Sequence, residues 1–395
     1  MRPLVAALLR LAPQTEISLF FVPDDYATGR EPDVARRLFP NVRVVPSPDY
    51  VRFALGGNVA SAPQRADLVL YLGGDLMHAA RVRARLGAHG CAYKFSRKRY
   101  NAFFERVYAV DEKNVAELVR AGVEREHIEV VGNLAIDGAL AEAAGAFAAA
   151  EPTEPAIPGD GVLVLPGTRR HEVANLVPFF LQTALQLRTL DPELNVAFAI
   201  SPFTPVDELE RALATGGHPN VWGARGRVVR TEAGIALQAA GDERLYPVVR
   251  DAMRHAPHAR LVLTIPGTKC VELAALGVPA LVVVPLNVPE VVVINGPLQY
   301  VERLPLIGIP LKRAAVVAVD RRFAVTVQPN IDAGEMLMPE LRGTLMPGEV
   351  ARKVVAYASD APARERAATK LRELYAAHAG ASERLARALL EGAPR

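Results

Sequence analysis

The chain has 395 residues, of which 50% are hydrophobic and 23% are charged, and its formal net charge at pH 7 is +3. These values exclude a disordered chain and give no indication of a nucleic-acid partner, and the length predicts two domains. Two isolated cysteines, Cys91 and Cys270, form neither a disulfide framework nor a zinc motif, so we expect a reducing, cytoplasmic environment. We also expect no secretion signal and no membrane span, because no apolar run reaches the ~18 residues that a span needs.

Residues 1–150 predict a first α/β domain. Apolar, β-branched runs predict strands, and amphipathic stretches between them predict helices. Strands that alternate with helices in this way form a parallel sheet that is covered on both faces. The expected helices are 3–11, 33–39, 76–87, 112–121 and 136–150, and the expected strands are 17–22, 42–45, 67–72, 91–95, 106–110 and 128–131.

Residues 151–160 contain three prolines and are the predicted linker. The alternation then restarts, which predicts a second domain over 161–345, followed by C-terminal helices over 346–395 in which 362–392 form one long helix. The predicted fold class is therefore α/β, with two doubly wound, Rossmann-like domains that face a cleft. In the second domain we expect strands at 161–165, 195–200, 227–237, 260–265 and 281–284, and helices at 170–190, 205–214 and 243–256.

A glycine turn follows the strand 161–165. Pro166 and Gly167 end the strand, Thr168 can cap the next helix, and Arg169 and Arg170 add positive charge. Free backbone N–H groups and the positive end of the helix dipole meet at such a turn, which favours a bound phosphate. An ordinary strand-to-helix turn with solvated arginines would have the same residues.

A second turn of this kind follows the strand 260–265. Gly267 and Thr268 begin the next helix, Lys269 lies beside them, and Glu272 is one turn further along. A carboxylate at that position can accept hydrogen bonds from ribose hydroxyls. Two such turns in one domain favour a nucleotide site more than one turn does, although two ordinary helix caps are the alternative.

Four segments resemble, in order, the motifs of lipid A disaccharide synthases. Residues 131–137 (VGNLAID) are similar to the family's VGHPLVD, and residues 165–172 (LPGTRRHE) to its LPGSRxxE. Residues 267–279 (GTKCVELAALGVP) are similar to SGTATLEAALLGVP, and residues 328–341 (QPNIDAGEMLMPEL) to LPNILAGREVVPEL.

The resemblance implies a GT-B glycosyltransferase: a hexosyltransferase that moves a glucosaminyl group, acylated in the family, from a UDP-sugar to a lipid-linked or phosphorylated sugar acceptor. It implies inversion, lipid A biosynthesis, and no cofactor or metal. The alternatives are another GT-B enzyme, such as a UDP-GlcNAc epimerase, or a homologue that binds nucleotide-sugar without turnover, because diphosphate turns do not encode the reaction. By position, the residues of the substrate site are Gly167, Thr168, Arg169 and Arg170 at the diphosphate, Gly267, Thr268 and Glu272 at the nucleotide, and Asn330 in the donor pocket.

Asp75 is the candidate catalytic base, since it matches the position of the family's acidic base. An inverting transfer needs one base to deprotonate the acceptor hydroxyl. His78 is a second candidate, because an imidazole titrates near neutral pH. The alternatives are that Asp75 caps a helix and that His78 is a surface residue.

Between residues 81 and 106 there are eight basic residues and one acidic residue, with five aromatic residues interleaved. This composition suits an anionic membrane surface or a phosphorylated lipid acceptor, so we expect a peripheral protein on the inner face of the cell membrane and no nucleic acid. A solvated helix face with aromatic residues in the core is the alternative. The residues assigned to this surface are Lys94, Arg97, Lys98 and Arg99.

The chain departs from the family in three places, one of which is the unusual Pro- and Val-rich path of residues 285–325. The family begins with a strand and a Gly-rich loop that have no counterpart here, so we expect the N-terminal sheet to lack a central strand, which puts activity in doubt. Glu335 stands where the family's AGRE has a basic residue. These departures leave the sugar and its acyl chains undetermined.

Overall fold

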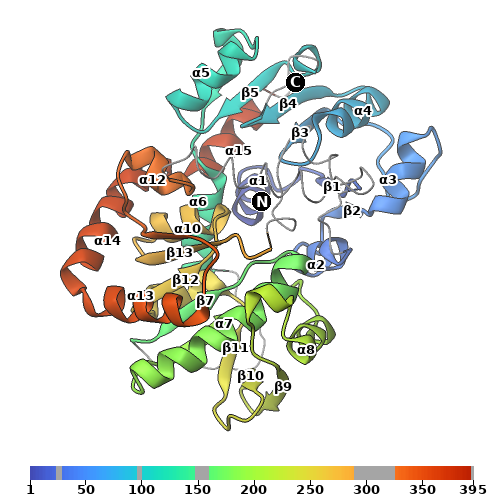
Figure 1. The fold of residues 1–395 in the computed structure, drawn as a ribbon. Helices are drawn as coiled ribbons and strands as arrows, with labels where there is room; N and C mark the ends of the chain where they lie inside the picture. Colours follow the sequence, from blue (N-terminus) through green and yellow to red (C-terminus); the bar gives the residue numbers. More distant parts are fainter. Residues whose placement is uncertain (24–28, 96–99, 147–159, 289–324, 393–395) are drawn as a thin grey trace, which may run out of the picture. The chain divides into compact units, whose positions relative to one another are not determined.

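The computed structural model describes residues 1–23, 29–95, 100–146, 160–288 and 325–392. The chain forms two compact units, one of Met1–Gly138 with Ala377–Arg395 and one of Ala139–Ala376. Figure 1 shows both as helices around parallel sheets. The α/β class predicted from the sequence is confirmed. The predicted linker lies outside the described residues except for Asp160.

The first unit contains two separate parallel sheets. In the larger sheet the strands lie in chain order, and in the smaller sheet Leu19 is aligned with Val44. No ladder of the described residues joins the two sheets. The strands are β1 (Ser18–Phe20) and β2 (Arg43–Val45) in the small sheet, and β3 (Leu68–Tyr71), β4 (His89–Tyr93), β5 (Arg106–Ala109) and β6 (Ile128–Val130) in the large one.

The last helix of the chain packs in this first unit, beside the first helix (Figure 1). The carboxylate of Asp137 accepts hydrogen bonds from the backbone N–H groups of Gly380 (2.7 Å) and Ser382, and the Arg384 guanidinium donates to the carbonyl of Val131. These bonds hold the start of the last helix. The helices of the unit are α1 (Arg2–Leu11), α2 (Glu31–Leu38), α3 (Ser47–Ala54), α4 (Leu76–Leu86), α5 (Glu112–Arg120), α15 (Ala381–Gly392) and α6 (Leu134–Ala143), which continues into the second unit.

The second unit is built on an eight-stranded sheet in the order β14-β13-β12-β7-β8-β11-β10-β9. Strands β14 to β11 are parallel, and the hairpin β9–β10 adds an antiparallel edge. The strands are β7 (Val162–Leu165), β8 (Val196–Ala199), β9 (Gly226–Thr231), β10 (Gly234–Ala239), β11 (Tyr246–Val249), β12 (Leu261–Thr264), β13 (Ala280–Pro285) and β14 (Glu340–Gly343).

Helix α7 is the main helix against this sheet, and its buried side chains follow the predicted spacing. Val173, Val177, Phe180 and Ala184 are at most 1% exposed, so one face of the helix is fully enclosed in the core. The helices of the unit are α7 (Arg170–Leu190), α8 (Val206–Thr215), α9 (Ala252–His255), α10 (Thr268–Ala275), α12 (Gln328–Ala333), α13 (Pro347–Ser359) and α14 (Ala361–Tyr375). Five short 3₁₀ turns complete the described elements: η1 (Asn101–Phe103), η2 (Arg125–His127), η3 (Pro219–Val221), η4 (Ala256–His258) and η7 (Ala376–His378).

The structure contains a helix that was not expected, α3, and it differs from the prediction at two expected elements. Residues 243–256, expected as one helix, contain the strand β11 and only four residues of α9, because the run Tyr246–Val249 pairs with both β8 and β10. Residues 362–392, expected as one long helix, form α14 and α15 with a break between them. Gly380 at that break has a φ of +81°, a conformation that ends helices and that glycine adopts without strain.

Candidate functional site

The order of the strands in the second unit reverses direction at β7 and β12. From β7 the chain moves to β8 and β11 on one side, and then returns to β12 on the other side of β7. In a doubly wound sheet, ligands bind outside the carboxyl ends of the strands at this reversal point. Leu165 and Thr264 are aligned at the ends of the two strands. The two predicted glycine turns therefore follow neighbouring strands at the same edge of the sheet.

The backbone donors of the turn after β7 are already occupied by a carboxylate of the chain itself. One carboxylate oxygen of Glu172, Oε2, accepts hydrogen bonds from the backbone N–H groups of Thr168 (2.8 Å) and Arg169 (3.0 Å). Gly167 has a φ of +102°, and a side chain there would collide with this carboxylate. The N–H groups that the sequence assigned to a diphosphate are thus engaged by the helix's own third residue, as in a capping box.

Two cations stay at the mouth of this turn. The Arg169 guanidinium is 43% exposed and lies 3.7 Å from the second carboxylate oxygen of Glu172. Arg170, the first residue of α7, is also exposed. The turn after β7 therefore offers positive side chains at its surface rather than free backbone donors.

The turn after β12 has the opposite character. Within the described residues, the backbone N–H groups of Thr268 and Lys269 have no hydrogen-bond acceptor, and they lie at the positive end of α10. Glu272, whose side chain is 15% exposed, accepts a hydrogen bond of 2.6 Å from the Lys269 ammonium. Burial raises the pKa of Glu272, and the charge of Lys269 opposes that rise. Free donors, an ammonium and a carboxylate thus meet at one turn.

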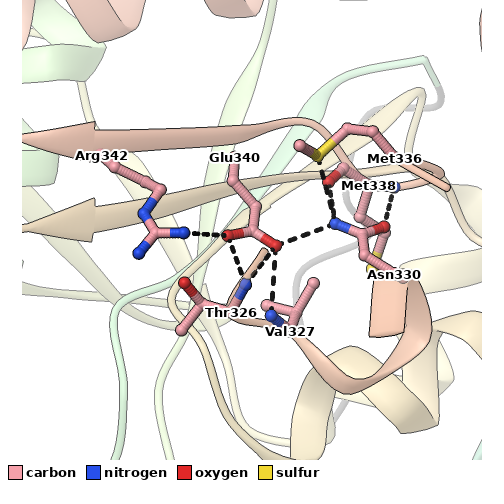
Figure 2. Close-up of polar contacts among 7 residues, drawn as sticks. All are labelled: Thr326, Val327, Asn330, Met336, Met338, Glu340 and Arg342. Carbon is pink, nitrogen blue, oxygen red and sulfur yellow. Dashed lines mark hydrogen bonds and ion pairs between the residues drawn. The ribbon is translucent and has the colours of Figure 1, made fainter. Parts of the chain in front are cut away.

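Asn330, predicted to line the donor pocket, is 1% exposed and bonded within the chain. Its amide donates to the carbonyl of Met338 and to Glu340, and its oxygen accepts from the backbone of Leu337 and Met338. Figure 2 shows the carboxylate of Glu340 at the centre of this network, between the start of α12 and Arg342. In this structure the amide organises the turn that precedes β14.

Asp75 and His78, the candidate bases, lie at the start of α4 in the first unit. The Asp75 carboxylate accepts a hydrogen bond of 2.9 Å from the backbone N–H of Met77, which is the geometry of a helix cap. The His78 Nδ1 lies 2.6 Å from the hydroxyl oxygen of Tyr50. The roles of both residues in catalysis remain predictions.

The arginines of α4 are used within the first unit. Arg81 donates to the carbonyl of Ala54, Arg83 is paired with Glu105, and Arg85 donates to the carbonyl of Gly57 and lies over the ring of Phe53. Three of the eight basic residues of this stretch are therefore bonded within the first unit, although Arg81 and Arg85 stay exposed. Lys94 adopts a left-handed backbone with φ +67° next to Tyr93. Arg97, Lys98 and Arg99 lie outside the described residues.

The sequence prediction missed one cation, which lies at the carboxyl end of a strand of the second unit. Arg250 follows β11 directly, and its guanidinium donates to the carbonyls of Ser201 (2.9 Å) and Thr204 beyond β8. The sequence predicted a helix over 243–256, so it did not predict that Arg250 follows a strand. The described part of the chain contains no cluster of His, Cys, Asp or Glu suited to a metal ion, and none of its helices is long and apolar enough to cross a membrane.

No family model and no curated protein matches this sequence, whereas solved structures match nearly its whole length. A Listeria monocytogenes protein assigned as a UDP-N-acetylglucosamine 2-epimerase has a TM-score of 0.60 and 14% identity, over 99% of this chain and 93% of its own. A second UDP-N-acetylglucosamine 2-epimerase has a TM-score of 0.57 and 14% identity, over 99% and 92%. Staphylococcus aureus MnaA with UDP has a TM-score of 0.53 and 12% identity, over 94% and 95%.

These likenesses show a GT-B-like fold, as predicted, and correct the predicted activity. The structures that resemble the chain are named for a 2-epimerase, which is an isomerase, and give no support to a lipid A disaccharide synthase. The predictions of a glycosyltransferase, of hexosyl transfer and of lipid A biosynthesis were therefore wrong. Three of the four motifs that suggested them lie in the second unit, and a shared fold does not specify the reaction.

Proposed function

We propose that the second unit binds a UDP-sugar in the crevice between β7 and β12, and that the chain isomerises this sugar in the manner of a 2-epimerase. The observation that carries the proposal is the turn after β12, where unengaged N–H groups of Thr268 and Lys269 lie one helical turn from the Glu272 carboxylate. Backbone donors at a helix start suit a phosphate, and a carboxylate suits the hydroxyls of a ribose.

The two turns then have unequal roles. The Glu172 carboxylate occupies the donors of the first turn and would repel a diphosphate there, so the phosphates lie closer to α10 than to α7. Lys269 can exchange its bond to Glu272 for a phosphate oxygen, which releases the carboxylate for the ribose. Arg169 and Arg170 then neutralise the remaining charge from the surface.

An isomerase also suits what the structure shows of the predicted acceptor surface. A transferase needs a second site for its acceptor, whereas an epimerase acts on one substrate. The arginines Arg81, Arg83 and Arg85, which favoured an anionic acceptor, are bonded to other groups of the first unit. The neighbouring structures named as epimerases support the same reaction class.

Calorimetric titration with UDP tests the nucleotide site. We expect saturable binding and a raised melting temperature, both abolished in Glu272→Ala. Glu210→Ala is the matched control, because Glu210 is an exposed glutamate of α8, outside the candidate site, and its loss should leave UDP binding unchanged. Absence of UDP binding by the wild-type chain would overturn the proposal.

Incubation with UDP-N-acetylglucosamine tests the reaction. Proton NMR should show a second set of sugar signals from the C2 epimer, without release of UDP over the same period. Binding of UDP with no isomerised sugar would overturn the epimerase assignment and leave a nucleotide-sugar-binding protein without turnover.

A further inference from the structure

A hollow lies in the second unit, far along α7 from the turn that follows β7. Its volume is about 520 Å³, within the range of about 300–1,000 Å³ that is usual for small-molecule sites. Gln182 and Gln186 line it from α7, and they lie 12 and 16 residues beyond Arg170, or about 18 and 24 Å along the helix. The start of α13, which packs beside α7, forms the other wall (Figure 1).

An exposed indole forms one side of this hollow. Trp222 is the only tryptophan of the chain, is 43% exposed, and follows η3 in the left-handed conformation with φ +50°. A bulky side chain is strained there and persists only where its surroundings hold it. They do so here, because the backbone N–H of Ala224 donates to the carbonyl of Pro178 in α7 and Val221 is buried. The backbone that carries the indole is thus held at the hollow.

Two amides face the same space. Gln182 and Gln186 are four residues apart, so they lie on one face of α7, and both are only half-buried among fully buried neighbours of the helix. Neither amide has a hydrogen-bond partner among the described residues. Each amide offers donors and an acceptor together, which is the complement that a hydroxyl group needs.

The charges of the hollow balance. Glu349 and Arg352 line it from the first turns of α13, one negative and one positive. The Glu349 carboxylate also accepts a hydrogen bond of 3.0 Å from the backbone N–H of Met346, which fixes its place. A ligand with a net charge would gain from one of these groups and lose to the other, so the hollow favours a neutral ligand.

We propose that this hollow is a second binding site, for a neutral saccharide. One face of a pyranose ring is apolar and matches the indole, while its hydroxyls match the two amides and the Arg352 guanidinium. A single site of this kind holds one or two sugar units. The inference stands apart from the nucleotide crevice and does not depend on it.

The single tryptophan makes the site directly measurable. We expect N-acetylglucosamine, glucose, chitobiose or cellobiose to shift the emission of Trp222 saturably to shorter wavelength, with UDP at saturation leaving the curve unchanged. Gln182→Leu and Gln186→Leu should each raise the saccharide dissociation constant at least tenfold. Gln64→Leu, at an exposed glutamine of the first unit, is the control and should change it less than twofold.

A second pair of variants tests the charged wall. Arg352→Gln should weaken binding at least threefold, whereas Lys353→Gln, at the next and exposed position of α13, should not. No saturable response to any of the four sugars would overturn the proposal, as would a response that survives both glutamine variants. Loss of the saccharide response with UDP binding intact would count against this site alone.

Discussion

Replacing Asn330 tests whether this residue holds the chain together or holds a ligand. Asn330 lies in α12 with 1% of its surface exposed, and its amide has four hydrogen bonds to oxygen or nitrogen. It donates to Met338 O at 2.8 Å and to Glu340 Oε1 at 2.9 Å, and accepts from Leu337 N at 2.9 Å and Met338 N at 2.8 Å. Asn330→Leu keeps most of the volume and removes all four bonds.

The expected loss of stability follows from the buried polar groups that lose a hydrogen-bond partner. Two buried backbone N–H groups, of Leu337 and Met338, and the carbonyl of Met338 lose a partner, and each such loss costs about 1–3 kcal/mol. The turn can relax and admit water, so the costs do not add in full. We expect Asn330→Leu to lower the free energy of unfolding by about 3–4 kcal/mol, near the upper end for single substitutions.

Urea unfolding followed by Trp222 emission measures this loss, because the only tryptophan lies in the same unit as Asn330. Gln328→Leu is the matched control on the same helix. Gln328 is bonded only to Asp332, at the surface, and its replacement should cost less than about 0.5 kcal/mol. If Asn330→Leu instead unfolds at the same urea concentration as the wild type but no longer binds UDP, the structural role of Asn330 is refuted. The amide would then contact the ligand and not stabilise the turn.

Three further predictions concern the two turns and the thiols. Glu172→Gln should lower the stability of the second unit by about 1 kcal/mol, because an amide weakens the cap on Thr168 and Arg169; an unchanged urea midpoint would contradict this. Cys91 and Cys270 are buried and burial raises the pKa of their thiols to about 11 and about 12, so Ellman's reagent at pH 8 should react with both only in denaturant. Burial raises the pKa of Glu272 above the usual value of about 4.3, and UDP binding needs the carboxylate form, so UDP affinity should be lost as the pH falls through this raised pKa. Lys269→Met removes the charge that lowers the pKa of Glu272, so it should move this loss of affinity to still higher pH. Calorimetric titrations at stepped pH measure the displacement, and its absence would show that Glu272 is not at the ribose.

The sequence predicted best where the determinants are local. The α7 helix was expected at 170–190 and is found at Arg170–Leu190, because its apolar residues recur at helical spacing and Pro166 and Gly167 stop the strand before it. The same local signals placed the turn at Gly267. Because β7 and β12 are neighbours in a parallel sheet, these two correctly placed turns also came together in space.

The prediction failed where long-range pairing decides the outcome. Residues 246–249 are β-branched or aromatic around Pro247, but the surrounding segment read as helical, and only pairing with β8 and β10 makes it a strand. Glu172 bonds back to the backbone N–H of Thr168, so the donors that the sequence assigned to a phosphate are already engaged. The burial of Asn330 depends on Glu340, ten residues away, and no periodicity reveals it.

The four motifs that suggested a transferase encode the fold more than the reaction. In 131–137, the carboxylate of Asp137 holds the start of α15; in 165–172, Glu172 caps α7; and in 328–341, Asn330 and Glu340 bond to each other. These polar side chains form hydrogen bonds within the chain. A protein that shares them therefore shares the local structure that they stabilise. Among the four, the segment 267–279 differs, because Glu272 lies beside backbone N–H groups that have no acceptor among the described residues. A match over all four motifs therefore supports a GT-B-like fold, and the reaction must be read from groups that the motifs do not contain.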